Sequence, residues 1–153
     1  MTRLQDQFNR GFLGDAWHGD AVFDVLATIS AEQAVARPVG GGHSIEEIVR
    51  HMSAWMTNVR LRSAGEADGT ATDWPSGSGT AEESWAGAVT GLRADFDAMG
   101  EFLAGLTDAQ LGREVAGTIR TYSVYQDLHG VLQHTLYHLG QIVLLKKLTE
   151  ADG

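Results

Sequence analysis

The residues of this chain that could do chemistry are its six histidines, His18, His43, His51, His129, His134 and His138. His134 and His138 are four residues apart in a segment with helical periodicity, so their rings would project from one side of a helix, about 6 Å apart along its axis. This spacing lets two imidazoles share one metal ion. A pair alone is weak support for a metal site, because helices also carry such pairs as ordinary surface or core residues.

The position of these rings relative to the apolar faces strengthens the metal hypothesis. At about 100° per residue, the pair lies at one flank of an apolar arc formed by Val124, Leu128, Val131, Leu139 and Ile142. His51 lies likewise at the flank of another apolar face, beside Ile48 and Trp55. Three imidazoles at the borders of two core-facing stripes can converge where the helices pack. Three neutral nitrogens would leave coordination positions for water or substrate, which is typical of a catalytic site.

Three helices that would position these side chains are predicted from their capping boxes and their apolar periodicity. One begins at Ser44, in the sequence Ser-Ile-Glu-Glu, and should run to about Ala64. A second begins at Thr80, in Thr-Ala-Glu-Glu, and should stop near Gly105. The last begins near Ser123 and carries Lys146 and Lys147 in its final turns. In this interpretation Glu46 and Glu47 are capping charges of the first of these helices.

The N-terminal helix has the weakest signal. Val22, Val25, Leu26 and Ile29 give it a face, but the glycines before them obscure its start, and we place it from about His18 to Ile29. Residues 26–33 resemble residues 103–110, and each segment is followed by a polar linker and a capped helix, which favours a bundle of two helical hairpins. The connection over 65–79 is a solvated crossover or a lid pinned by Trp74.

Composition excludes several classes of function. The 153 residues, 43% of them hydrophobic, suffice for one buried core, and we expect a single domain over 1–153. A net charge of −9 disfavours nucleic acid and anionic membranes as partners. Without cysteine there are no thiolate ligands or nucleophiles. We find no signal peptide and no stretch approaching the roughly 20 apolar residues of a membrane span, so we expect a cytoplasmic protein.

Two segments resemble the signature helices of the DinB/YfiT-like metalloenzymes. They are His43-Ser-Ile-Glu-Glu-Ile-Val-Arg-His51 followed by Trp55, and Leu128-His-Gly-Val-Leu-Gln-His134-Thr-Leu-Tyr-His138-Leu-Gly-Gln141-Ile. The resemblance extends over almost the whole chain. It implies an all-α four-helix bundle in up-down-down-up order, with one divalent transition metal held by His51, His134 and His138. Zn or Ni fits such a site first, with Mn, Co or Fe as alternatives.

The resemblance also implies a range of functions. We expect a metal-dependent enzyme that acts on a small molecule, either by hydrolysis with a metal-activated water or by transfer or isomerisation with a low-molecular-weight thiol. The alternatives are a stress-related metal or small-ligand binding protein without turnover and a purely structural bundle. A homodimer is expected from the resemblance and from Leu145 and Leu148, which extend the apolar surface of the last helix.

The roles of the residues around the triad stay open at this stage. Gln141, His18, His129, Trp55 and Tyr137 are candidates for the pocket or for hydrogen bonds to the ligands, and structural roles are equal alternatives. His43 is expected to pack on Ile48 as a hydrophobic staple. Asp127 lies about 10 Å along the axis from His134, too far to bind the same ion from a straight helix. Trp17 and Trp74 are further candidates for pocket walls.

Overall fold

The computed structural model describes residues 3–66, 72–115 and 121–151, and within these ranges it is all-helical apart from one isolated bridge between Glu114 and Ser123. The helices of the described ranges are α1 (Arg3–Leu13), α2 (Val22–Leu26), α3 (Ala31–Val35), α4 (Ile45–Ala64), α5 (Ala81–Ala104), α6 (Asp108–Leu111) and α7 (Val124–Ala151). α4 and α5 begin at the capping boxes from which they were predicted, and they end at or next to the predicted residues. α7 begins at the predicted position.

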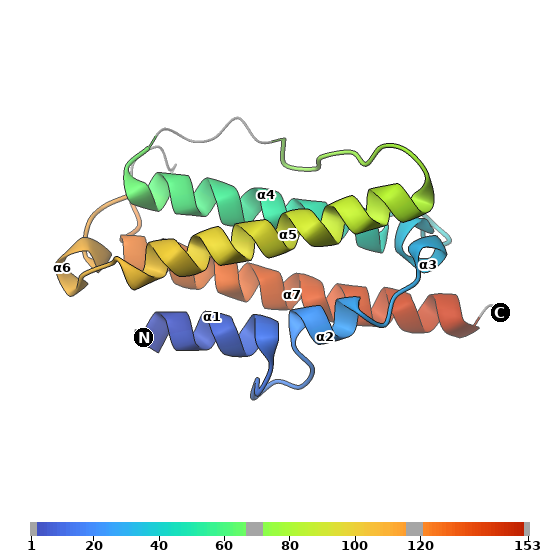
Figure 1. Ribbon diagram of the computed structural model, residues 1–153, viewed down its shortest axis with the longest axis horizontal. Coiled ribbons are helices and arrows are strands. Elements are labelled where there is room, and N and C mark those ends of the chain that lie inside the picture. Colours follow the sequence, from blue (N-terminus) through green and yellow to red (C-terminus); the bar gives the residue numbers. More distant parts are fainter. Residues whose placement is uncertain (1–2, 67–71, 116–120, 152–153) are drawn as a thin grey trace.

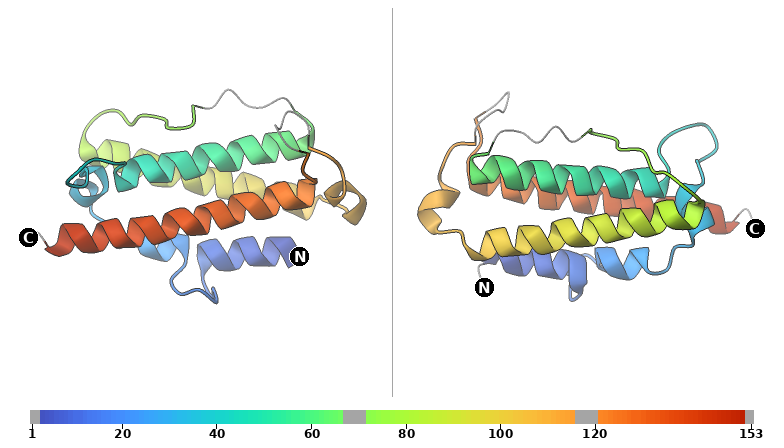
Figure 2. Two further views of the ribbon diagram at one scale, coloured as in Figure 1. Left: turned by 180° about the vertical axis from the view of Figure 1, so that it is seen from behind. Right: turned by 45° about the horizontal axis from the view of Figure 1, so that its top comes forward.

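The long helices form a four-helix bundle whose fourth side is α1 together with α2 (Figure 1). In Figure 1, α1 and α2 run from left to right, α4 and α5 both run from right to left, and α7 returns from left to right. The order is therefore up-down-down-up, as expected. Because α4 and α5 run the same way, the chain after α4 must return along the bundle to begin α5. Figure 2 shows α4 lying along both α5 and α7, and it packs against each of them.

The N-terminal side of the bundle corrects the sequence prediction. Instead of one helix from His18 to Ile29, there are two, separated by an exposed turn that includes His18. The turn follows Gly14 at φ 142° and Asp15 at φ 57°, conformations that end a right-handed helix. Gly11, in contrast, lies inside α1 as a packing residue, since a Cβ there would be only 3.3 Å from Cδ1 of Leu132.

The internal similarity of the two hairpins has a structural counterpart. Each of the related segments contains a short helix, α3 or α6, that begins with a capping box. Ser30 pairs with Gln33 in the first, and Thr107 pairs with Gln110 in the second. α3 follows α2 and leads to α4, and α6 follows α5 and leads to α7. The repeated Ser/Thr-x-x-Gln pattern thus marks equivalent corners of the bundle.

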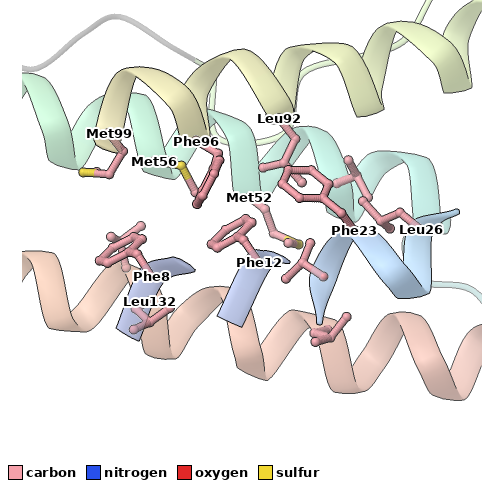
Figure 3. Close-up of a cluster of buried hydrophobic side chains, with 14 of the residues drawn as sticks. Phe8, Phe12, Phe23, Leu26, Met52, Met56, Leu92, Phe96, Met99 and Leu132 are labelled. Carbon is pink, nitrogen blue, oxygen red and sulfur yellow. The ribbon is translucent and has the colours of Figure 1, made fainter. Parts of the chain in front are cut away.

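A cluster of buried hydrophobic side chains fills the centre of the bundle (Figure 3). Phe12 contacts both Phe23 and Phe96, with ring centroids 5.6 and 4.9 Å apart, and so joins α1 to α2 and α5. Such pairs each contribute about 0.5–1.5 kcal/mol beyond their buried area. Met52 and Met56 of α4 reach the same cluster, and both are fully buried. This core fixes the helices on which the histidines lie.

In the described part of the chain, no helix combines the length and the apolar character that a bilayer crossing requires.

Candidate metal centre

Three of the six histidines come together between α4 and α7. His51 lies in the second turn of α4 and is 4% exposed, while His138 on α7 is 6% exposed and His134 is half-buried. The capping box of Ser44 and Glu47 fixes the start of α4 nearly two turns before His51. One helical turn separates the two histidines of α7, so both can face α4. Helix register and helix packing therefore bring together residues that are 83 positions apart in the sequence.

The three rings direct the same nitrogen towards a common point. Nε2 of His134 lies 3.1 Å from Nε2 of His51 and 3.1 Å from Nε2 of His138. Two imidazole nitrogens that bind one ion at about 2.0–2.1 Å lie roughly 3.0–3.4 Å apart. The ligand atoms of the cluster are all within 4.8 Å of one another. The observed spacing therefore fits a shared divalent ion, and these three residues could hold one.

Hydrogen bonds at the outer nitrogens fix the tautomers of two rings. Nδ1 of His51 donates to the carbonyl oxygen of Asp73 over 2.7 Å, and Nδ1 of His138 donates to Oε1 of Gln141 over 2.6 Å. Because carbonyl oxygens only accept hydrogen bonds, each Nδ1 carries the proton and each Nε2 presents a lone pair. Gln141 is itself oriented, since its Nε2 donates to the hydroxyl oxygen of Tyr137 over 3.1 Å. Metal-binding histidines usually have such partners.

His134 differs from the other two rings. Its Nδ1 is buried and has no hydrogen-bond partner among the described residues. Burial, together with the neighbouring His138 and His51, lowers the pKa of His134 to about 4. Burial also lowers the pKa of His138, although its hydrogen bond to Gln141 acts in the opposite direction. Both rings are therefore neutral near pH 7, the state in which imidazole binds a metal ion.

Aromatic rings surround the histidines. Trp74 stacks on His51, with centroids 3.9 Å apart and planes 8° apart, and Trp55 lies 5.6 Å from the ring of His134. Tyr137 contacts the ring of His138 at 5.1 Å. Nε1 of Trp55 donates to the carboxylate of Asp73 over 2.7 Å. The site is thus a polar cluster within largely apolar walls, an environment that strengthens electrostatic interactions.

A sequence model of the DinB superfamily matches residues 16–142, a range that includes all three histidines. The chain belongs to the DinB superfamily. Its fold is similar to that of a DinB-like protein from Bacillus subtilis, YjoA, with a TM-score of 0.71 over 97% of this chain and 92% of that one. Sequence identity to YjoA is 17%, so this likeness concerns the fold. Comparison with curated proteins finds no match.

The other predicted residues of this DinB-superfamily chain divide into two groups. Gln141, Tyr137 and Trp55 lie at the triad, in the contacts described above. His18 lies in the exposed turn between α1 and α2. His129 packs against Tyr125, with the ring planes tilted by 60°, and lines a separate cavity of about 620 Å³ between α1, α5, α6 and α7. His18 and His129 are thus not brought together with the triad.

Three further interpretations are corrected or extended by the structure. His43 stacks on Trp74, with centroids 3.5 Å apart, whereas a staple on Ile48 was expected. Glu46 is not a surface capping charge, because it is 5% exposed, pairs with Arg50 and accepts a hydrogen bond from Ser84. Trp17 is fully exposed and forms no pocket wall.

Asp73 is the residue at this site that sequence reasoning missed. It contacts Nδ1 of His51 through its backbone carbonyl at 2.7 Å and through its carboxylate at 3.3 Å, contacts that depend on how the segment before α5 lies against α4. The neighbouring Trp74 was the available signal, as a large aromatic residue within a polar linker.

Proposed function

We propose that the chain binds one divalent transition metal ion through His51, His134 and His138 and acts as a metal-dependent enzyme on a small molecule. The observation that carries this proposal is the convergence of three Nε2 atoms, with that of His134 3.1 Å from each of the other two and with two outer nitrogens fixed by carbonyl acceptors. A closed structural site usually has four protein ligands. Among the described residues, the cluster found here has three.

Three neutral ligands leave both charge and coordination positions of a divalent ion unsatisfied. When bound, the ion would supply Lewis acidity, which activates water for hydrolysis or binds the sulfur of a low-molecular-weight thiol. Imidazole ligands and the absence of cysteine favour Zn or Ni, with Mn, Co or Fe as alternatives.

The chain's own residues would orient the site. Gln141 and the carbonyl of Asp73 hold two imidazoles in the required tautomer. The hydroxyl of Tyr137 accepts from Gln141, and its own proton remains able to donate to a substrate oxygen. Tyr137 is 65% exposed, which suits a contact with an incoming small molecule.

The alternative is a stress-related metal or small-ligand binding protein without turnover. The observation that favours it is the stacking of Trp74 on His51, which covers one side of the triad. Turnover on a panel of substrates decides between the two functions.

The test compares metal-free and metal-loaded protein. Elemental analysis of protein purified without added metal identifies the ion, and this form is then assayed on thiol-acceptor and ester substrates. The large hydrophobic core should keep the metal-free chain folded, so removal should lower the thermal midpoint modestly and abolish activity. If the metal-free chain unfolds while the loaded chain shows no turnover, the ion is structural and the enzyme proposal is wrong.

We also propose a homodimer, built on the C-terminal part of α7. Leu148 is 53% exposed, and Leu145 beside it is half-buried. Burial of such side chains against a second copy would remove apolar area from water. Sedimentation at tens of micromolar should show a dimer, and a monomer would contradict this proposal.

A further inference from the structure

Residues 73–77, here called the strap, lie next to the triad and belong to the connection between the end of α4 and the start of α5. The strap contacts three groups of residues whose positions it could control. Asp73 accepts from His51 and Trp55, Trp74 lies between two histidine rings, and Gly77 packs on a buried polar group of α4 and α5.

Trp74 is the centre of a stack of three rings. Its centroid lies 3.9 Å from that of His51 and 3.5 Å from that of His43, with interplanar angles of 8° and 3°. Stacking fixes the plane of the His51 ring, but it permits a 180° rotation about the Cβ–Cγ bond, which returns the ring to the same plane. A flipped ring would present Cε1 in place of Nε2 to the other two histidines and could not bind an ion.

The carbonyl of Asp73 removes this ambiguity. It accepts a hydrogen bond from Nδ1 of His51 over 2.7 Å, a bond that exists in only one of the two ring orientations. The Asp73 carboxylate is held in turn by Nε1 of Trp55 over 2.7 Å. The stack therefore determines the plane of His51, and the hydrogen bond determines which nitrogen points towards His134 and His138.

Gly77 anchors the other end of the strap. A Cβ at this position would lie 1.9 Å from Oγ of Ser84 and 2.3 Å from Oε1 of Glu46, so only glycine fits. Both partners are buried and engaged, because Ser84 donates to Glu46 and Arg50 pairs with Glu46. They cannot move aside without breaking this network. The close approach of Gly77 thus depends on α4 and α5, away from the histidines.

We propose that the strap is a positioning element, in which Trp74 and Asp73 hold His51 in the orientation that binds metal and Gly77 keeps the strap seated. The part of this inference that concerns metal exchange rests on the proposed function, because it requires that the triad binds an ion. A bound ion would dissociate faster once the strap no longer contacts His51, since the His51 ring could then rotate away from the ion.

The experiment compares the wild-type protein with Trp74→Leu, Trp74→Phe, Gly77→Ala and Gly87→Ala. Gly77→Ala lifts the strap without altering any residue that touches the triad. Gly87→Ala is its matched control, since the added Cβ would meet Arg50 of the same polar network at an ordinary 3.5 Å. Circular dichroism on heating establishes that each variant is folded.

Two readouts are used. Nitrogen-15 NMR of the histidine rings in the metal-free protein reports the tautomer of His51. Competition between the protein and a chelator for Zn²⁺ gives the affinity of the protein for Zn²⁺ and the rate at which Zn²⁺ dissociates. In Trp74→Leu and Gly77→Ala, His51 should lose its single Nδ1–H tautomer. Zn²⁺ affinity should fall by about 10- to 100-fold, through faster dissociation. Trp74→Phe should keep part of the His51 tautomer preference and part of the Zn²⁺ affinity, and Gly87→Ala should match the wild type in both.

The outcomes separate the two proposals. If folded Trp74→Leu and Gly77→Ala proteins keep the His51 tautomer and the Zn²⁺ dissociation rate of the wild type, the strap has no positioning role. If the wild type binds no ion but the His51 tautomer changes in these variants, the metal proposal is wrong and the positioning role stands. Should Trp74→Leu fail to fold, Gly77→Ala and Trp74→Phe carry the test.

Discussion

Two buried polar clusters join α4 to α7, and they differ in how completely their atoms are paired. Near the C-terminal end of α4, Arg62 forms two hydrogen bonds to the carboxylate of Asp127, at 2.9 and 2.6 Å. Near the other end, the three histidines direct their Nε2 atoms at one another, and Nδ1 of His134 has no partner among the described residues.

This difference indicates different roles for the two clusters. A bidentate ion pair satisfies both charges within the protein and has no need of a ligand. Three neutral imidazoles whose Nε2 atoms face one another gain little from that proximity, because Nε2 of His51 and Nε2 of His138 carry lone pairs and only Nε2 of His134 could donate a proton. The same pair of helices thus holds a saturated cluster, suited to stability, and an unsaturated one, suited to binding.

The largest expected effect is on metal binding by the triad. A structural zinc site gains about 10–16 kcal/mol from about four ligands. Each ligand therefore accounts for roughly 2.5–4 kcal/mol, or roughly 60- to 700-fold in affinity. His51→Ala, His134→Ala and His138→Ala should each lower affinity by this factor, as measured by competition with a chelator. Full loading of His51→Ala in elemental analysis would contradict the proposed triad.

The second prediction concerns the saturated cluster. Arg62→Met leaves the carboxylate of Asp127 buried without its partner, which should lower the free energy of unfolding by about 3–5 kcal/mol. The double variant Arg62→Met with Asp127→Leu should recover much of this loss, since it removes both charges. Chemical denaturation measures both effects. Metal affinity should stay within about twofold of the wild type if the clusters are independent.

The two clusters also show what could be predicted from the sequence. His134 and His138 were found from their spacing, and His51 from its place at the flank of an apolar face, because helical geometry converts both patterns into positions. Asp127 was excluded as a ligand by distance along the helix, and its partner Arg62 could not be identified without the register between α4 and α7. That register depends on the packing of the whole core.

On the N-terminal side of the bundle, helix α1 was not predicted from the sequence. Leu4, Phe8 and Phe12 are spaced by four and are all buried, yet the glycines around them obscured α1. Glycine has two opposite meanings here, a packing contact at Gly11 and a helix end at Gly14. Only the tertiary structure distinguishes them. The contacts of the strap could not be predicted for a similar reason, because only the tertiary structure shows that Asp73 and Trp74 lie against His51.

The third prediction is a pH dependence of the metal-free protein. The pKa of His134 is about 4 in the folded state, below the ordinary 6.5, and that of His138 is also lowered. Below pH 6.5 the unfolded chain therefore binds protons that the folded chain does not. Stability should be fully present above about pH 6.5 and should decrease as the pH falls towards 4. Thermal unfolding between pH 7.5 and 4.5 should show a smaller decrease for His134→Leu than for the wild type. An equal decrease in both would contradict this assignment.

The smallest expected effect is that of His43→Ala, which probes the outer face of the ring stack. His43 lies outside the triad and stacks on Trp74, and its side chain is 43% exposed. Its removal costs Trp74 one stacking contact of about 0.5–1.5 kcal/mol. The contact of Trp74 with His51 and the hydrogen bond from His51 to Asp73 both remain. Metal occupancy should therefore stay near that of the wild type, with affinity lowered by no more than about threefold, since only part of the stacking energy reaches the site.

His43→Phe, which keeps a flat ring over Trp74, is the matched control. A loss of occupancy in His43→Ala as large as that in His51→Ala would place His43 among the ligands and overturn the three-histidine site.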